Sequence, residues 1–164
     1  MLPQVVSRFK QPIVFTIMII TFFTLMSRID FIVHSSLYNY GLKFSYDWAI
    51  NYWVTYNVIF VAFGIIVSVT YWLASNKSRR ALKLSCALLI TITLLAVGGL
   101  QDILFFVLWG GGLPQISVIW WWAPWVSVMG TWNSQMQIAL TTLMSCASIL
   151  TWIIAAKNSR PVQI

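Results

Sequence analysis

Apolar residues form four long runs along the chain, separated by short polar or glycine-rich stretches. Each run has about 20 residues or more, and a helix rising ~1.5 Å per residue needs about that many to cross ~30 Å of hydrocarbon. The pattern therefore predicts an all-α fold, an integral membrane four-helix bundle in a single transmembrane domain. The predicted spans cover about residues 12–33, 48–74, 81–109 and 133–156.

The segments between the runs predict where these helices end. The polar stretch "HSSLYNYGLKFSYD" predicts a loop after the first span, and the basic turn "SNKSRR" at 75–80 marks the clearest boundary. The glycines and proline of "GGGLP", at 110–114, stop the third span. Residues 115–132 are too short and too rich in Trp for another crossing, so they predict an interfacial or re-entrant segment.

Composition supports a membrane protein and argues against a nucleic-acid partner. Hydrophobic residues make up 60% of the chain and charged residues only 8%, far from the make-up of a soluble domain. The net charge is +7, but the basic residues stand in short groups at the edges of the apolar runs. That distribution indicates membrane topology, and no nucleic acid is expected to bind.

The basic residues also predict the orientation of the bundle. With four spans, most of them fall on one side, which the positive-inside rule makes cytoplasmic. We therefore expect a multi-pass protein of the cell membrane with both termini in the cytoplasm. The tryptophans gather near the opposite boundary, as in an aromatic belt. The basic residues on the predicted inner side are Arg8, Lys10, Lys77, Arg79, Arg80, Lys83, Lys157 and Arg160.

Candidate chemistry is concentrated at the predicted outer ends of the spans. The chain has three acids, no Glu and one His, and Asp30 and His34 share a helix face at i,i+4 spacing. Asp102 is flanked by apolar sequence on both sides, where an ionisable group is costly unless it faces protein or water. The candidates for ligand binding or proton transfer are Asp30, His34, Asp47, Asn51, Asp102, Trp48 and Trp109.

Three interpretations of this polar layer remain open. One imidazole with carboxylates suits Zn, Mn or Fe, although no paired ligand motif supports a metal. The same groups suit proton transfer or an organic cation in an aromatic-walled pocket. The third interpretation, which we favour, is that they are interfacial residues that pair with Arg28, Lys43, lipid headgroups or a neighbouring subunit. Arg28 itself points about 200° away from Asp30 around the helix, so it is expected to reach headgroups. The candidate metal ligands are Asp30, His34, Asp47 and Asp102.

Missing motifs narrow the function. The chain has no Walker loop, GxSxG, GxGxxG or HExxH, and a single His excludes chain-internal sites that need two. No cofactor is indicated, and we do not expect catalysis by this chain alone. The first hypothesis is a non-catalytic accessory subunit of a larger membrane complex, such as a respiratory or monooxygenase-type oxidoreductase. Its expected partners are membrane lipids and either other membrane subunits or further copies of itself.

Two other functions compete with the accessory subunit. The alternative is a stand-alone binding protein or enzyme with an outer-leaflet pocket for a lipid-like or cationic small molecule. A transporter ranks third, because the span centres lack ionisable residues and no pair of Gly- or Pro-interrupted helices is evident. Gly98 and Gly99, inside the third span, are expected to allow close approach of a neighbouring helix.

The layout of the chain is similar to that of one known family. It has four spans, many aromatic residues, and an acid at the outer end of each of the first three spans: Asp30, Asp47 and Asp102. It resembles the EXPERA family of sterol isomerases and the sigma-2 receptor. The resemblance is one of arrangement, and the absence of any Glu departs from what that family uses.

Overall fold

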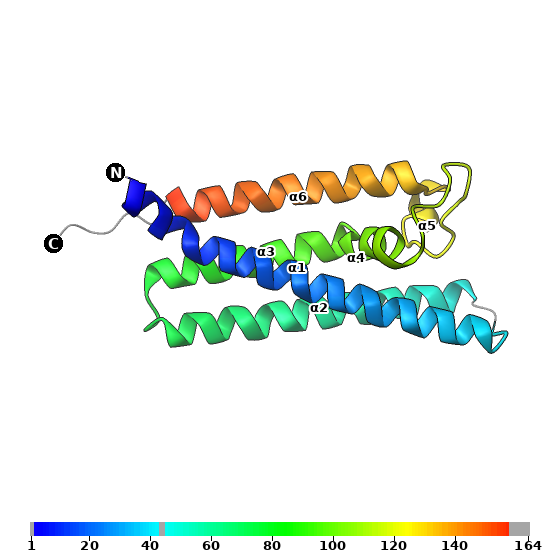
Figure 1. The fold of residues 1–164 in the computed structure, drawn as a ribbon, viewed down its shortest axis with the longest axis horizontal. Coiled ribbons are helices and arrows are strands. Elements are labelled where there is room, and N and C mark those ends of the chain that lie inside the picture. The colour runs from blue at the N-terminus through cyan, green and yellow to red at the C-terminus, as the bar shows by residue number, and fades with distance from the viewer. Residues whose placement is uncertain (1, 43–44, 158–164) are drawn as a thin grey trace.

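Four long helices lie side by side in the structure, a computed structural model that describes residues 2–42 and 45–157, with side chains from residue 11 onward (Figure 1). All four are long and apolar enough to cross a membrane, so the prediction of an all-α, multi-pass membrane protein is confirmed. The long helices are α1 (Leu2–Asn39), α2 (Tyr46–Ala74), α3 (Arg79–Val97) and α6 (Ser134–Lys157). The short elements are α4 (Leu100–Leu104), the π-helix η1 (Phe105–Trp109) and α5 (Val126–Met129).

The bundle has two distinct ends. The start of α1, the turn between α2 and α3 and the end of α6 lie together at one end (Figure 1). The other end, which we call the cavity end, contains the end of α1, the start of α2, and the short elements α4, η1 and α5 (Figure 1). The arrangement brings the basic turn and the last turn of α6 to one side, as the four-span prediction requires. Which side faces the cytoplasm stays a prediction.

Polar side chains set the limits of α2 and α3. The Ser45 hydroxyl accepts the Trp48 backbone N–H at the start of α2, and the Ser78 hydroxyl accepts the Ala81 N–H at the start of α3. Such caps satisfy N–H groups that have no partner within the helix. Between the two helices, Asn76 and Lys77 adopt left-handed backbone conformations that turn the chain. The predicted boundary at 75–80 therefore exists, although Arg79 and Arg80 already belong to α3.

The first helix is longer than predicted. We expected a loop from His34 onward, whereas α1 continues to Asn39. The His34 ring packs edge-on against the rings of Tyr52 and Phe105, with centroids 5.3 and 5.7 Å away. These ring contacts stabilise the helix at His34. The loss of hydrophobicity in the sequence after Val33 therefore does not mark the end of the helix.

The third span is divided, which corrects the prediction of one helix over 81–109. α3 ends at Val97, and Gly99 has a left-handed backbone with φ +67° before α4 begins. Gln137 on α6 stabilises the break, because its Nε2 donates to the freed Gly98 carbonyl at 2.9 Å. The Thr141 hydroxyl donates to the same carbonyl. A Cβ on Gly99 would lie 2.0 Å from Gln137 Nε2, and one on Gly98 would lie 2.8 Å from Met144 Cβ, so α6 approaches here as expected of the two glycines.

Aromatic side chains form two clusters in the interior. Between α1 and α2, the Phe23 and Phe60 rings stack at 4.3 Å and the Phe22 and Phe63 rings at 3.7 Å. At the cavity end, Trp120 and Trp132 form a second cluster inside residues 110–133, the Trp-rich connection between η1 and α6. This connection is irregular apart from the single turn of α5, and whether it is interfacial stays a prediction.

Candidate functional site

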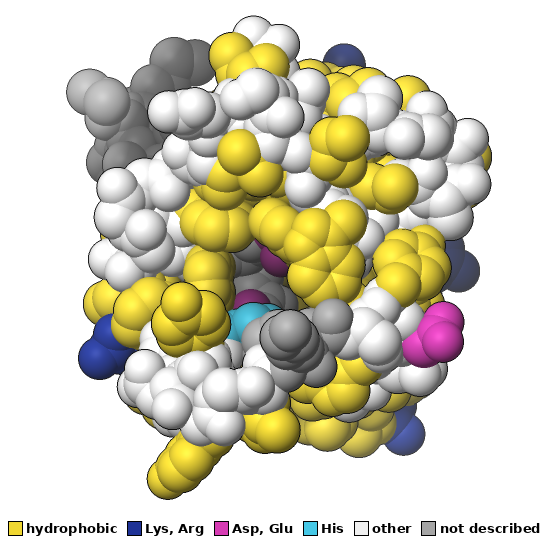
Figure 2. Space-filling view, turned by 90° about the vertical axis from the view of Figure 1, so that its right-hand side faces the viewer, with side chains coloured by type: hydrophobic (Ala, Val, Ile, Leu, Met, Phe, Trp, Pro, Cys, Tyr) yellow, Lys and Arg dark blue, Asp and Glu magenta, His cyan; other side chains and the backbone are white. Residues whose placement is uncertain are grey.

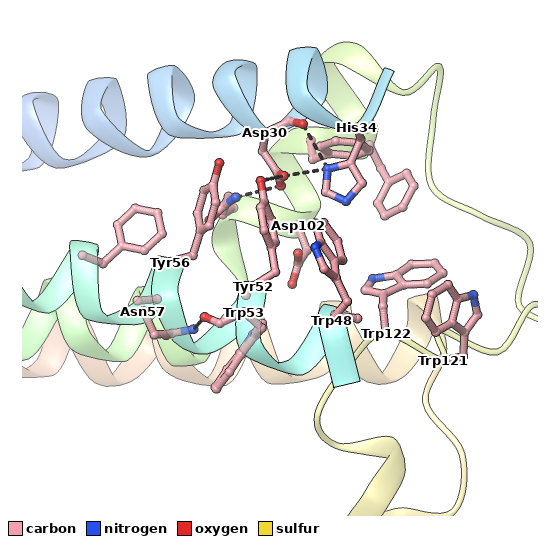
Figure 3. A pocket seen from close by; sticks show the side chains of 17 residues that line it. Asp30, His34, Trp48, Tyr52, Trp53, Tyr56, Asn57, Asp102, Trp121 and Trp122 are labelled. Carbon is pink, nitrogen blue, oxygen red and sulfur yellow. Dashed lines mark hydrogen bonds and ion pairs between the residues drawn. The ribbon is translucent and has the colours of Figure 1, made fainter. Parts of the chain in front are cut away.

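A cavity of about 240 Å³ opens at the cavity end, between α1, α2, α4, η1 and the Trp-rich connection. Figure 2 views this end and shows a hollow framed by hydrophobic side chains, with His and acidic side chains at its floor. Among the described residues, no Lys or Arg lines it. Polar side chains of the wall come from α1, α2 and α4, and three of them contact Asp30: His34, Tyr52 and Gln101 (Figure 3).

The Asp30 carboxylate is the centre of a hydrogen-bond network. Its side chain is buried, with the residue only 6% exposed, and its Oδ1 accepts the Tyr52 hydroxyl at 2.6 Å. The Oδ2 atom accepts the Gln101 amide at 2.8 Å. These bonds cross three elements, so they fix α1, α2 and α4 relative to one another (Figure 3). These hydrogen bonds hold the carboxylate in place. They also lower the free-energy cost of burying it far below that of an unpaired carboxylate.

His34 completes the network. Its Nδ1 lies 2.8 Å from Asp30 Oδ1 and 3.0 Å from the Asp30 backbone oxygen. Both neighbours are acceptors, so Nδ1 carries the proton. This bond orients the imidazole, whose other edge faces the Trp48 side of the cavity (Figure 3). The i,i+4 spacing predicted that Asp30 and His34 share a face, and the structure places them in direct contact.

Asp102 occupies a different environment. The half-buried residue lies on α4 and lines the cavity close to Asp30 and His34 (Figure 3). Within the described residues, no hydrogen-bond donor contacts its carboxylate, in contrast to Asp30. The rings of Phe105, Phe106 and Trp122 line the same space. The cavity therefore contains one acid that the protein satisfies and one that it leaves available.

Aromatic rings make up most of the remaining wall. Trp48 and Tyr52, one helical turn apart on α2, stack at 4.8 Å. Trp121 and Trp122, edge to face at 5.9 Å, line the cavity where the Trp-rich connection meets it (Figure 3). Aromatic faces carry negative charge density, so these walls suit a cation as well as an apolar group.

The structure brings together only part of the predicted candidate set. Asp30, His34, Asp102 and Trp48 all line the cavity. Asp47, Asn51 and Trp109 do not: the first two are exposed on α2, and Trp109 packs outside the cavity. The cluster predicted from sequence therefore divides into residues that line the cavity and residues that lie outside it.

The proposed metal site is not assembled. Asp47, one of its four candidate ligands, lies away from the cavity formed by the other three. In the part of the chain that the structure describes, no group of three His, Cys, Asp or Glu side chains could hold a metal ion. Geometry therefore gives the metal hypothesis no support.

Trp109 contacts α1 outside the cavity. Its Nε1 donates to the buried Ser27 hydroxyl at 3.0 Å, and the Arg28 guanidinium lies over its ring at 4.8 Å. Arg28 is exposed while Asp30 is buried, in agreement with the helical geometry that separated them. Arg28 therefore contributes to the surface of the bundle and not to the site.

Sequence reasoning missed Tyr52 and Gln101, which donate the hydrogen bonds to Asp30. Tyr52 follows Trp48 at i+4, a helical spacing that could have assigned both to one face. Gln101 immediately precedes Asp102 in an apolar run, and that polar pair was the available signal. Nothing local indicates that Gln101 contacts a residue 71 positions earlier.

Comparison with known proteins identifies no relative of this chain. The chain matches no protein-family model, no curated protein and no solved structure.

Proposed function

We propose that this small multi-pass membrane protein binds a small organic cation in the cavity at the end of its bundle. The observation that carries the proposal is the Asp102 carboxylate, which lines an aromatic-walled cavity without a donor from the described residues. A carboxylate in such surroundings is costly unless a partner pairs with it. An organic cation would supply both the opposite charge and the apolar surface that the walls accommodate.

The two acids would have separate tasks. Asp30 is satisfied by Tyr52, Gln101 and His34 and acts as a structural centre of the wall. Asp102 is the group left to pair with the ligand. Trp48, Tyr52 and Trp122 present the rings that would surround the positive charge. A carboxylate together with aromatic faces is the arrangement by which proteins recognise ammonium groups.

The size of the cavity limits the ligand. Its volume of about 240 Å³ lies below the roughly 300–1,000 Å³ of typical small-molecule pockets. It would therefore receive a small amine, or the charged head of a longer amphiphile whose chain extends through the mouth.

The test measures binding of hexyltrimethylammonium to the purified full chain in lipid nanodiscs, with hexanol as the neutral probe of the same chain length. Asp102→Asn should weaken binding of the cation about 10- to 100-fold, since an interaction with a charged group contributes about 1.5–3 kcal/mol. Binding of hexanol should change little. Asp47→Asn is the matched control, because Asp47 is an exposed acid near the same end that does not line the cavity.

Two results would contradict the proposal. One is equal affinity of the wild-type chain for the cation and for hexanol. The other is a loss of cation binding in Asp47→Asn as large as that in Asp102→Asn, since the effect would then follow net charge and not the cavity.

A second candidate is the accessory subunit of a larger membrane complex. An apolar groove of about 310 Å³ between α1 and α6 favours it, since a helix of another subunit could fill such a groove. Residues such as Ile13 and Ile17 on α1 face Ile149 and Ile153 on α6 across it. Native mass spectrometry after gentle extraction tests this function. A stoichiometric complex with other subunits would support it, and a monodisperse monomer would contradict it.

A further inference from the structure

The Trp-rich connection presents an apolar outer surface. Six of its large hydrophobic side chains are exposed, and Val128 reaches 80%. An exposed apolar surface of this kind marks a site of contact with a membrane or with another protein. The exposed residues are Ile116, Val118, Ile119, Trp121, Val128 and Met129.

The connection is well anchored from beneath. Trp120 is fully buried, and its backbone N–H donates to the Trp132 carbonyl at 2.8 Å. The Ser134 hydroxyl donates to the Pro114 carbonyl, and the Trp132 Nε1 donates to Gln137 Oε1 at 2.8 Å. The apolar groups therefore face outward on a segment that already has its own buried cluster and hydrogen bonds.

The absence of charged residues favours lipid as the partner of this surface. Residues 103–156 contain no Asp, Glu, Lys, Arg or His, so the connection is as free of charge as the flanking helices. Among the described residues, Figure 2 shows hydrophobic side chains around the hollow and basic side chains only at the margin of the view. Tryptophan prefers the membrane–water boundary, and a surface that projected into water would ordinarily carry charged residues.

We infer that residues 115–130 are embedded in the headgroup–acyl boundary of the leaflet at the cavity end, so the cavity opens into that boundary. Trp121 and Trp122 belong to this segment and also line the cavity. A ligand would therefore reach Asp102 from the leaflet and not from bulk water. This second step rests on the proposed function and restricts the ligand to amines that partition into membranes.

Collision accessibility of nitroxide labels in lipid vesicles tests both steps. Cys86 and Cys146 are exposed, so Cys86→Ala and Cys146→Ala give a background without other thiols. Labels at Val128→Cys and Ile119→Cys report the segment, and a label at Trp121→Cys reports the mouth. Leu143→Cys, exposed on α6, is the lipid control.

Asn39→Cys is the aqueous control at the same end. Asn39 is exposed on α1 and lies 27 residues beyond Pro12, about 40 Å along the helix and past the ~30 Å hydrocarbon layer. For the segment and mouth labels, we expect collisions with oxygen to exceed those with a water-soluble nickel chelate several-fold, as for the Leu143→Cys label. The Asn39→Cys label should show the reverse order.

Each of the other outcomes overturns either the membrane embedding of the segment or the access of ligand from the leaflet. Nickel-dominated collisions at Val128→Cys and Ile119→Cys would place the segment in water and overturn the inference. Labels shielded from both reagents would show that protein covers the surface, which also overturns it. Oxygen-dominated segment labels with a nickel-dominated Trp121→Cys label would leave the segment embedded and overturn access from the leaflet. None of these readouts needs a ligand, so they are independent of the amine-binding test.

Discussion

Gln101 donates its amide to the Asp30 carboxylate at 2.8 Å, joining two residues 71 positions apart in the chain. Gln101 follows the helix break at Gly98 and Gly99, so the hydrogen bond links that break to the charged centre of the cavity. Both residues are buried.

Gln101→Ala should destabilise the fold by about 1–3 kcal/mol, because it removes one donor from a buried carboxylate. The midpoint of thermal unfolding in detergent measures the effect. Gln135→Ala is the control, since Gln135 is exposed on α6 and a change there should stay within about 0.5 kcal/mol. Equal midpoints for the two variants would show that the Asp30–Gln101 bond does not contribute to stability.

Tyr52→Phe removes the second donor to Asp30 and keeps the ring that stacks on Trp48. We expect a loss of about 1–3 kcal/mol, against little change in Tyr46→Phe, whose side chain is exposed. Tyr52 and Gln101 bind the same carboxylate, so the double variant should deviate from additivity by at least about 0.5 kcal/mol. Strict additivity would mean that the two bonds are independent.

Gly99→Ala tests the helix break. Its φ of +67° disfavours any side chain by about 1–2 kcal/mol, and the new Cβ would also lie 2.0 Å from Gln137 Nε2. Gly41→Ala is a close match, because Gly41 has φ +69° with nothing within 4 Å of the added Cβ. Gly99→Ala should therefore lower the unfolding midpoint by clearly more than Gly41→Ala. A similar loss in both would leave backbone strain as the whole effect and contradict the close contact with α6.

Acidification should weaken binding of hexyltrimethylammonium, whose own charge does not change with pH. Protonation of Asp102 removes the negative charge that would pair with the ligand, and protonation of His34 adds a positive charge to the same cavity. Both changes oppose cation binding, so affinity should fall as pH decreases. Titrations in nanodiscs between pH 4 and 8, roughly the range in which carboxyl and imidazole groups titrate, measure the effect. In Asp102→Asn the dependence should be clearly reduced, and an unchanged profile would assign the titration to another group.

The sequence by itself determined the number of long helices and most of their limits. Uninterrupted apolar runs specify helices that satisfy their own backbone within a membrane, and this signal is local. The turn at 75–80 and the stop at 110–114 were equally local, because glycine, proline and charged residues act on their own neighbourhood. The shared face of Asp30 and His34 followed from helical periodicity alone.

Only the tertiary structure decided which polar residues form the cavity. The break after Val97 depends on Gln137 and Thr141 of another helix, which satisfy the Gly98 carbonyl. That break places Gln101 beside Asp30 and turns Asp102 into the cavity. Asp47 and Asn51 have the same i,i+4 spacing as Asp30 and His34 yet lie on an exposed face, because spacing defines a face without saying which way it points. Contacts between distant segments set that direction, and no local pattern records them.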